Sequence, residues 1–95
     1  MGCKLSLNEV LSQLSSWELT NDGREAVVKE FNFTNFKSAF SFMTSIALKS
    51  EEVGHHPEWY NVYNKVKITL TTHDVNGLSE KDIILGKFID NQYEK

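Results

Sequence analysis

Hydrophobic residues near the N-terminus of this chain recur at the spacing of one helix face. They are Leu7, Val10, Leu11 and Leu14, which follow the i, i+3, i+4, i+7 pattern. Ser6 and Glu9 have the spacing of a capping box, and Leu5 with Val10 has that of the hydrophobic staple around it. The pattern predicts a first helix from Leu5 to Leu14.

After this helix the spacing changes to that of strands. Trp17 to Leu19 is a candidate short strand, Asn21-Asp22-Gly23 supplies a turn, and Arg24 to Phe33 returns as a second strand. The odd positions of the second strand point to one side, with a lysine interrupting the apolar row: Val27, Lys29, Phe31 and Phe33. We therefore predict a β-hairpin.

The longest predicted helix begins near Thr34 or Asn35, which are both good N-cap residues. An apolar stripe follows it, formed by Phe36, Ala39, Phe40, Met43, Ile46 and Ala47. We expect these side chains to be buried, with Phe36, Phe40 and Met43 in the core. Gly54 is the expected end of the helix, because glycine takes a left-handed conformation at low cost. Pro57 cannot continue a helix and stiffens the loop that follows.

A second hairpin is predicted next. Trp59 to Tyr63 forms one strand, Asn64-Lys65 the turn, and Val66 to His73 the other strand. One face of the last strand is apolar and carries Val66, Ile68 and Leu70. The opposite face carries Lys67, Thr69, Thr71 and His73.

The final segment predicts a turn and a helix. Asn76-Gly77 is the turn, and Leu78-Ser79-x-x-Asp82-Ile83 opens the helix with a variant of the capping box. The expected buried side is formed by Ile84, Leu85, Phe88 and Ile89. The order α-β-β-α-β-β-α predicts an α+β fold, a two-layer sandwich with a four-stranded antiparallel sheet and helices on one face.

Composition narrows the class of protein. The chain has 95 residues, which suits one domain over 1–95, and its net charge of −3 is unlike the basic surface of a nucleic-acid binder. The apolar runs are too short to span a membrane. The single cysteine, Cys3, agrees with a reducing compartment, so we expect a cytoplasmic location, with the nucleus as an alternative. Gly2 and Ser6 fit an N-myristoylation pattern only loosely, and we expect no lipid there.

Three histidines are the candidate chemical groups. His55 and His56 follow the long helix and His73 ends a strand, which are places where scaffolds hold working side chains. Histidine gives and takes protons near neutral pH, and adjacent residues in an extended segment point to opposite sides. We therefore expect acid–base chemistry on a bound ring, with different roles for His55 and His56. Trp59 and Tyr60 are candidate surfaces on which a flat heterocycle could stack.

Other kinds of site remain as alternatives. Three histidines could ligate zinc, although neither H-x-x-x-H nor H-x-H spacing occurs. A Ser–His–Asp arrangement is weaker, because no serine stands on a glycine-flanked elbow. Phosphate binding lacks a glycine-rich loop.

Read together, these segments resemble the pterin-4a-carbinolamine dehydratases, which in animals also act as dimerisation cofactors of a homeodomain transcription factor. The resemblance extends from about Trp17 to Ile89. It is carried by Glu51-x-x-x-His55-His56-Pro57-x-Trp59-x-Asn61-Val62-Tyr63, by Thr72-His73-Asp74-x-x-Gly77-Leu78-Ser79-x-x-Asp82, and upstream by Phe31-x-Phe33-x-x-Phe36 and Ala39-Phe40-x-Phe42-Met43.

The resemblance implies a reaction and a set of residues. Such enzymes remove water from 4a-hydroxytetrahydropterin, the spent cofactor of aromatic amino-acid hydroxylases, and use no metal or organic cofactor. The implied acid–base group is His55, His56 and His73, with Glu51 orienting a histidine or the ring. The implied substrate contacts also include Gly54, Pro57, Trp59, Thr71, Thr72 and Asp74.

This chain departs from the family pattern at two positions, and the resemblance also implies partners. Animal members have an acidic residue where this chain has Gly54, and often glutamate where it has Asp74. Family members form dimers and tetramers, so a homo-oligomer is expected, with a transcription-factor partner in animals only and no direct nucleic-acid or membrane contact. A second hypothesis is a non-enzymatic binding module that uses the Phe36 to Ala47 segment.

Overall fold

The computed structural model describes residues 3–95, so the lipidation pattern at Gly2 lies outside the described residues. The helices and strands follow the predicted order α-β-β-α-β-β-α, with a short 3-10 turn before the last helix. Their bounds are α1 (Leu7–Gln13), β1 (Glu18–Leu19), β2 (Val27–Asn32), α2 (Phe36–Val53), β3 (Glu58–Val62), β4 (Lys65–Leu70), η1 (His73–Val75) and α3 (Glu80–Glu94).

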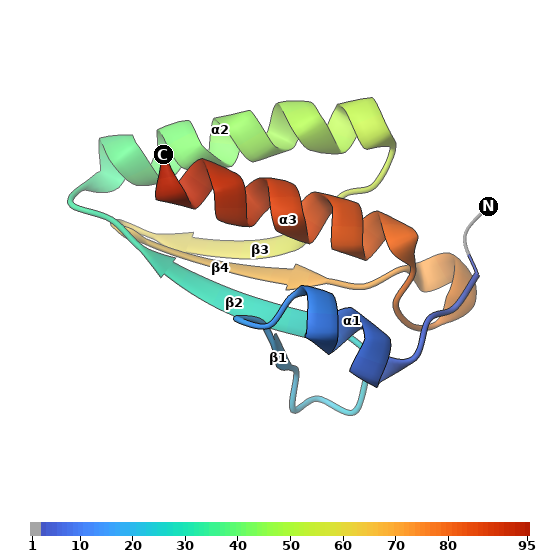
Figure 1. Ribbon diagram of the computed structural model, residues 1–95. Coiled ribbons are helices and arrows are strands. Elements are labelled where there is room, and N and C mark those ends of the chain that lie inside the picture. The colour runs from blue at the N-terminus through green and yellow to red at the C-terminus, as the bar shows by residue number, and fades with distance from the viewer. Residues whose placement is uncertain (1–2) are drawn as a thin grey trace.

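The four strands form one antiparallel sheet in the order β1-β2-β4-β3. Helices α2 and α3 run side by side across one face of this sheet (Figure 1). Helix α1 belongs to the same side, since the side chain of Leu14, which follows it, lies against Gly86 of α3. This arrangement confirms the predicted two-layer α+β sandwich.

The core lies between the sheet and the helices. The predicted apolar face of β4 is confirmed, because Val66, Ile68 and Leu70 are fully buried. In β2 the predicted interruption has a physical reason, since the ammonium of Lys29 reaches Asp90 at 2.7 Å while lying over the Phe31 ring. Lys29 therefore fits on the core-facing side of β2 because its ammonium group extends out of the core to a partly exposed carboxylate.

The buried face of α2 differs from the predicted one. Phe36 and Phe40 are 47% and 51% exposed, so placing them in the core was wrong, and Ala47 is exposed as well. The side chains that turn inward are Ala39, Phe42, Ile46 and Ser50, with Met43 half-buried. This helix carries two neighbouring apolar stripes, and periodicity alone cannot tell which one meets the sheet.

A smaller correction of the same kind applies to α3. Ile84 was expected in the core but is exposed, whereas the adjacent Ile83 is buried. Because Asp82 and Ile83 turn inward at the start of the helix, the next residue turns toward solvent. Leu85 and Ile89 are buried as predicted.

Several strands begin or end at other residues than the sequence predicted. The second hairpin turns at Tyr63 and Asn64, with Tyr63 at a φ of 51°, so Lys65 already belongs to β4. Strand β4 ends at Leu70, three residues before the predicted end at His73. Beyond it, Thr72 and Gly77 exchange two backbone hydrogen bonds, of 2.7 and 3.2 Å, and close a small loop that begins with His73.

Within residues 3–95 no helix has the length and apolar character needed to cross a membrane.

Candidate functional site

The turn after α2 sets the directions of the first two histidines. Gly54 has a φ of 69°, a left-handed conformation that ends the helix, and its N–H bonds to the carbonyl of Ser50. The N–H of His55 bonds to the same carbonyl at 3.1 Å. The chain therefore leaves the helix abruptly, and His55 turns inward while His56 turns outward.

His55 is the buried member of the pair, with 9% of its surface exposed. Its Nε2 lies 2.7 Å from Oδ1 of Asp82, which is fully buried at the start of α3. An ionised carboxylate only accepts hydrogen bonds, so Nε2 is then the donor and Nδ1 is the nitrogen left for a ligand.

The other oxygen of Asp82 is also occupied. Oδ2 accepts a hydrogen bond from Oγ1 of Thr72 at 2.6 Å and one from the backbone N–H of Ser79 at 3.0 Å. Since the single hydroxyl proton of Thr72 goes to Asp82, Ser79 Oγ donates to Thr72 across their 2.7 Å contact. The carboxylate that orients His55 is itself held by two donors.

His56 and His73 are more exposed, at 62% and 79% of their side chains. Nε2 of His56 lies 2.6 Å from Oε2 of Glu51, one helical turn back, which is the kind of orienting contact expected of that residue. Nε2 of His73 lies 3.6 Å from Oε2 of Glu58, which is an ion-pair distance but too long for a hydrogen bond.

The three histidines line one pocket of about 390 Å³, a volume within the range of small-molecule sites. The residues that line it are Gly54, His55, His56, Glu58, Thr69, Thr71, Thr72, His73, Asp74 and Lys81. The sequence-predicted residues Gly54, Thr71, Thr72 and Asp74 are thus brought together with the histidines.

Three expected contact residues lie outside this lining. Glu51 contacts His56, which lines the pocket, and Pro57 lies in the connection between α2 and β3. Trp59 pairs with Ile68 and packs against the core, because it follows Glu58 in a strand whose side chains alternate between faces. The stacking surface expected at Trp59 is therefore not in the pocket.

Sequence reasoning missed four residues of this region: Thr69, Glu58, Lys81 and Asp82. The clearest available signal was the spacing Ser79-x-x-Asp82, which predicted a helix cap. That cap is present, but its carboxylate also serves His55.

Arg24 joins two carboxylates, those of Asp22 and Glu58, and Glu58 lines the pocket. Arg24 donates to both oxygens of Glu58, at 2.7 and 3.0 Å, and these hydrogen bonds are the main cause that holds the pKa of Glu58 below its ordinary value. The same arginine donates to Asp22 and, with Thr20, lowers the pKa of Asp22 to about 2. The hydrogen bonds to both carboxylates raise the pKa of Arg24.

Metal ligation has no evident place in this arrangement. Among the residues that the structure describes, no three histidine, cysteine, aspartate or glutamate side chains gather closely enough to hold a metal ion. The zinc alternative therefore finds no ligand set in that part of the chain.

Comparisons with known proteins agree on one family. Residues 4–92 match the family model described as pterin 4 alpha carbinolamine dehydratase. A protein of Paraburkholderia xenovorans (strain LB400), provisionally named a pterin-4-alpha-carbinolamine dehydratase, is 47% identical over 91 residues, covering 93% of this chain and 94% of the relative. A protein of Burkholderia ambifaria with the same provisional name is 56% identical over 69 residues, covering 73% of this chain and 68% of the relative.

Solved structures of similar fold carry more than one description. A transcriptional coactivator/pterin dehydratase from Brucella melitensis superposes with a TM-score of 0.90 at 41% identity, covering 96% of this chain and 99% of that one. A pterin dehydratase-like protein identified as a RuBisCO assembly factor in the alpha-carboxysome has a TM-score of 0.70 at 26% identity, covering 82% and 89%.

Proposed function

Because this chain belongs to the pterin 4 alpha carbinolamine dehydratase family, we propose that it removes water from 4a-hydroxytetrahydropterin by histidine acid–base catalysis. The observation that carries the proposal is the buried His55–Asp82 pair at the edge of a pocket that His56 and His73 also line. The product is the quinonoid dihydropterin, and the step would return the pterin to tetrahydrobiopterin recycling.

The reaction requires two proton transfers, and the pocket offers groups for both. The C4a–O bond breaks as the leaving hydroxyl accepts a proton and departs as water. N5 loses its proton as the C4a–N5 double bond forms. Histidine is suited to both transfers near neutral pH, so no redox partner is needed.

We assign the donor role to His55. Asp82 fixes the ring through Nε2, so a single nitrogen, Nδ1, faces the leaving hydroxyl. In the proposed step the ring is in its imidazolium form, and Nδ1 gives its proton to that hydroxyl while Nε2 keeps its proton toward Asp82. His56 and His73, on the exposed side of the pocket, are the proposed acceptors of the N5 proton. Thr71, Thr72 and Asp74 lie among the histidines and are the proposed contacts to the heterocycle.

The proposal is tested by following dehydration of freshly generated 4a-hydroxytetrahydropterin. We expect wild-type protein to exceed the spontaneous rate, and His55→Ala or His73→Ala to lower kcat/KM by about 100-fold, the usual scale of a lost acid or base. Tyr93→Phe, which changes a hydroxyl bonded to Asn32 far from the pocket, serves as the control and should keep full activity. Wild-type protein that leaves the spontaneous rate unchanged would sink the proposal.

A second candidate function is a binding module without catalysis. The observation that favours it is the exposed apolar surface of α2, formed by Phe36, Phe40 and Leu48. A neighbour of this fold is described as an assembly factor, although at 26% identity. Copurification of a partner that persists in the His55→Ala, His56→Ala double variant and disappears with Phe40→Ser would support this function.

A further inference from the structure

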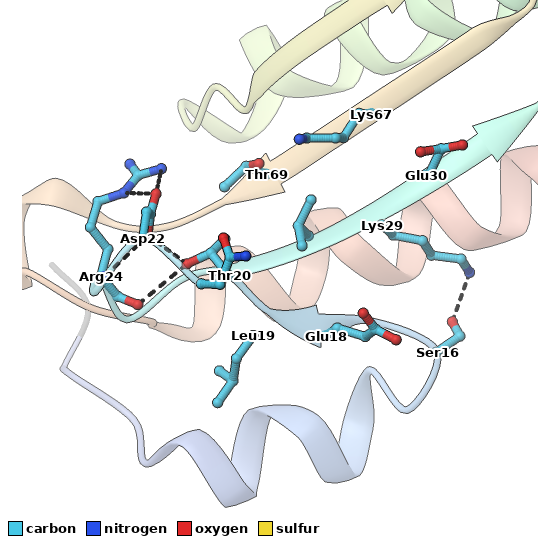
Figure 2. Close-up of a pocket in the computed structure, with 12 residues that line it drawn as sticks. Ser16, Glu18, Leu19, Thr20, Asp22, Arg24, Lys29, Glu30, Lys67 and Thr69 are labelled. Carbon is cyan, nitrogen blue, oxygen red and sulfur yellow. Dashed lines mark hydrogen bonds and ion pairs between the residues drawn. The ribbon is translucent and has the colours of Figure 1, made fainter.

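Glu58 stands at the boundary between the histidine pocket and a second hollow of the sheet. Across all four strands, Glu58 pairs with Thr69, Thr69 with Val28, and Val28 with Glu18, so these side chains share the face opposite helices α2 and α3. A hollow of about 820 Å³ lies on this face (Figure 2). Thr69 lines both hollows, whereas Arg24 lines the larger one and Glu58 the histidine pocket.

Arg24 is held in a fixed plane. Its Nε and Nη2 lie 2.9 Å from Oδ2 of Asp22, and Nη1 and Nη2 reach the two oxygens of Glu58. Figure 2 shows Asp22 between Arg24 and Thr20, and the Thr20 hydroxyl donates to Asp22 at 2.8 Å. A planar guanidinium that donates to two carboxylates at once favours one plane, and it therefore favours one orientation of the Glu58 carboxylate.

The carboxylate of Glu58 lies beside the ring of His73. This ring is largely exposed on a short 3-10 turn, and within the described part of the chain Glu58 is the acid that lies within 4 Å of it. The other charged or titratable groups that line the pocket are His55, His56, Asp74 and Lys81. An exposed ring without a partner populates several rotamers, and only some of them keep Nε2 beside Glu58 and leave Nδ1 for a ligand in the pocket.

We propose that Glu58, clamped by Arg24, is a positioning residue that directs His73 toward the bound heterocycle. The inference rests on the proposed function for its role in catalysis, but the orientation of His73 is a property of the ligand-free protein. The 3.6 Å separation then shortens to a hydrogen bond when substrate fills the pocket, as contacts of catalytic groups often do.

The first test is structural and needs no activity. NMR couplings and relaxation of the His73 side chain should report one dominant rotamer in wild-type protein and rotamer averaging in Glu58→Gln. Arg24→Lys should also cause averaging, because an ammonium cannot bind two carboxylates in one plane. A His73 ring equally ordered in all three proteins would overturn the proposal, even if the protein proved to have no dehydratase activity.

The second test is a double-mutant cycle in the dehydratase assay. We expect Glu58→Gln to lower kcat about 10-fold with little change in KM, which is part of the loss expected from removing the histidine itself. In the His73→Ala background the same change should have no further effect, because Glu58 acts through His73. Equal losses in both backgrounds, or no loss in wild-type protein, would contradict the proposal.

The matched control is another exposed glutamate of the same sheet face. Glu30 pairs with Lys65 at 3.7 Å, and both pairs are about half exposed, so their contributions to stability are similarly small. Glu30→Gln should therefore leave both the His73 rotamer and kcat unchanged. A loss in this variant equal to that of Glu58→Gln would show a general charge effect instead of positioning.

Discussion

The carboxylate of Asp82 makes hydrogen bonds to three other residues. It accepts hydrogen bonds from the Thr72 hydroxyl and the Ser79 backbone, and it orients the imidazole of His55. It has no exposed surface, so each lost hydrogen bond would leave a buried polar group without a partner. The two oxygen atoms of Asp82 therefore both stabilise the fold and set the geometry of the site.

Changing Asp82 to Asn should lower both properties. An amide keeps the shape but replaces one accepting oxygen with a donor, which then faces a donor of His55, Thr72 or Ser79. We expect a loss of about 1–3 kcal/mol in the free energy of unfolding and a marked fall in kcat. Chemical denaturation and the dehydratase assay measure the two effects.

Asp90→Asn is the matched control for that change. Asp90 lies on the same helix and bonds to Trp17 and Lys29, far along α3 from the pocket. This variant should lose stability while keeping kcat. If Asp82→Asn lost stability and kept kcat in the same way, the orienting role of Asp82 would be wrong.

At this scale the sequence offered candidate residues but not their distant partners. The histidines were singled out because they stand at the ends of predicted elements, and the cap at Asp82 was predicted from the local spacing Ser79-x-x-Asp82. The contacts between His55 and Asp82, 27 residues apart, and between Arg24 and Glu58, 34 apart, arise only when the sheet and helices are assembled. No local pattern encodes such a pair.

Among the elements, the end of α2 controls the pocket most directly. Gly54 combines a positive φ with open space around its Cα, since a Cβ there would have no atom within 4 Å. Any cost of a side chain at this position therefore comes from the backbone and not from crowding. The same turn directs His55 toward Asp82.

Gly54→Ala should lower the free energy of unfolding by about 1 kcal/mol, the usual cost of a left-handed conformation for a residue with a Cβ. Gly54→Asn should cost less, because asparagine tolerates this conformation better. Denaturation curves of the three proteins provide the measurement. An alanine variant as stable as wild type would mean that the helix can end without the left-handed turn.

Helices and strands could be told apart from the sequence because apolar residues recur at different spacings in the two, and β4 shows this most clearly. Its alternation placed Val66, Ile68 and Leu70 on the core side correctly. Helix α2 shows the opposite case, because apolar residues cover more than one of its faces. The structure buries Phe42 and exposes Phe40, a choice set by the packing of the helix on the sheet.

Three apolar side chains of α2 are exposed on the surface of the whole molecule: Phe36, Phe40 and Leu48. Phe36 and Phe40 pack against each other with ring centroids 5.5 Å apart, and Leu48 is exposed on the same helix. A cluster of this kind on one helix is typical of an interaction surface. Since the family resemblance implies dimers and tetramers, we expect a second copy of this chain to cover it.

Replacing Phe36 and Phe40 with Ser together should therefore lower the mass of the protein in solution, because both rings lose their burial against the second copy. Sedimentation equilibrium measures the mass directly. Leu19→Ser, which changes an exposed leucine on β1, is the control and should leave the mass unchanged. A doubly substituted protein with the wild-type mass would place the self-association surface elsewhere or exclude it.

The loop that Thr72 and Gly77 close carries one part of the site, and the packed interior of the protein carries the other. His55 and Asp82 belong to the packed interior, whereas His73 stands on a loop whose two ends are tied to each other by backbone hydrogen bonds. Changes among residues 73–76 would therefore alter the groups that this loop presents to the pocket, while the packed interior that holds His55 stays the same.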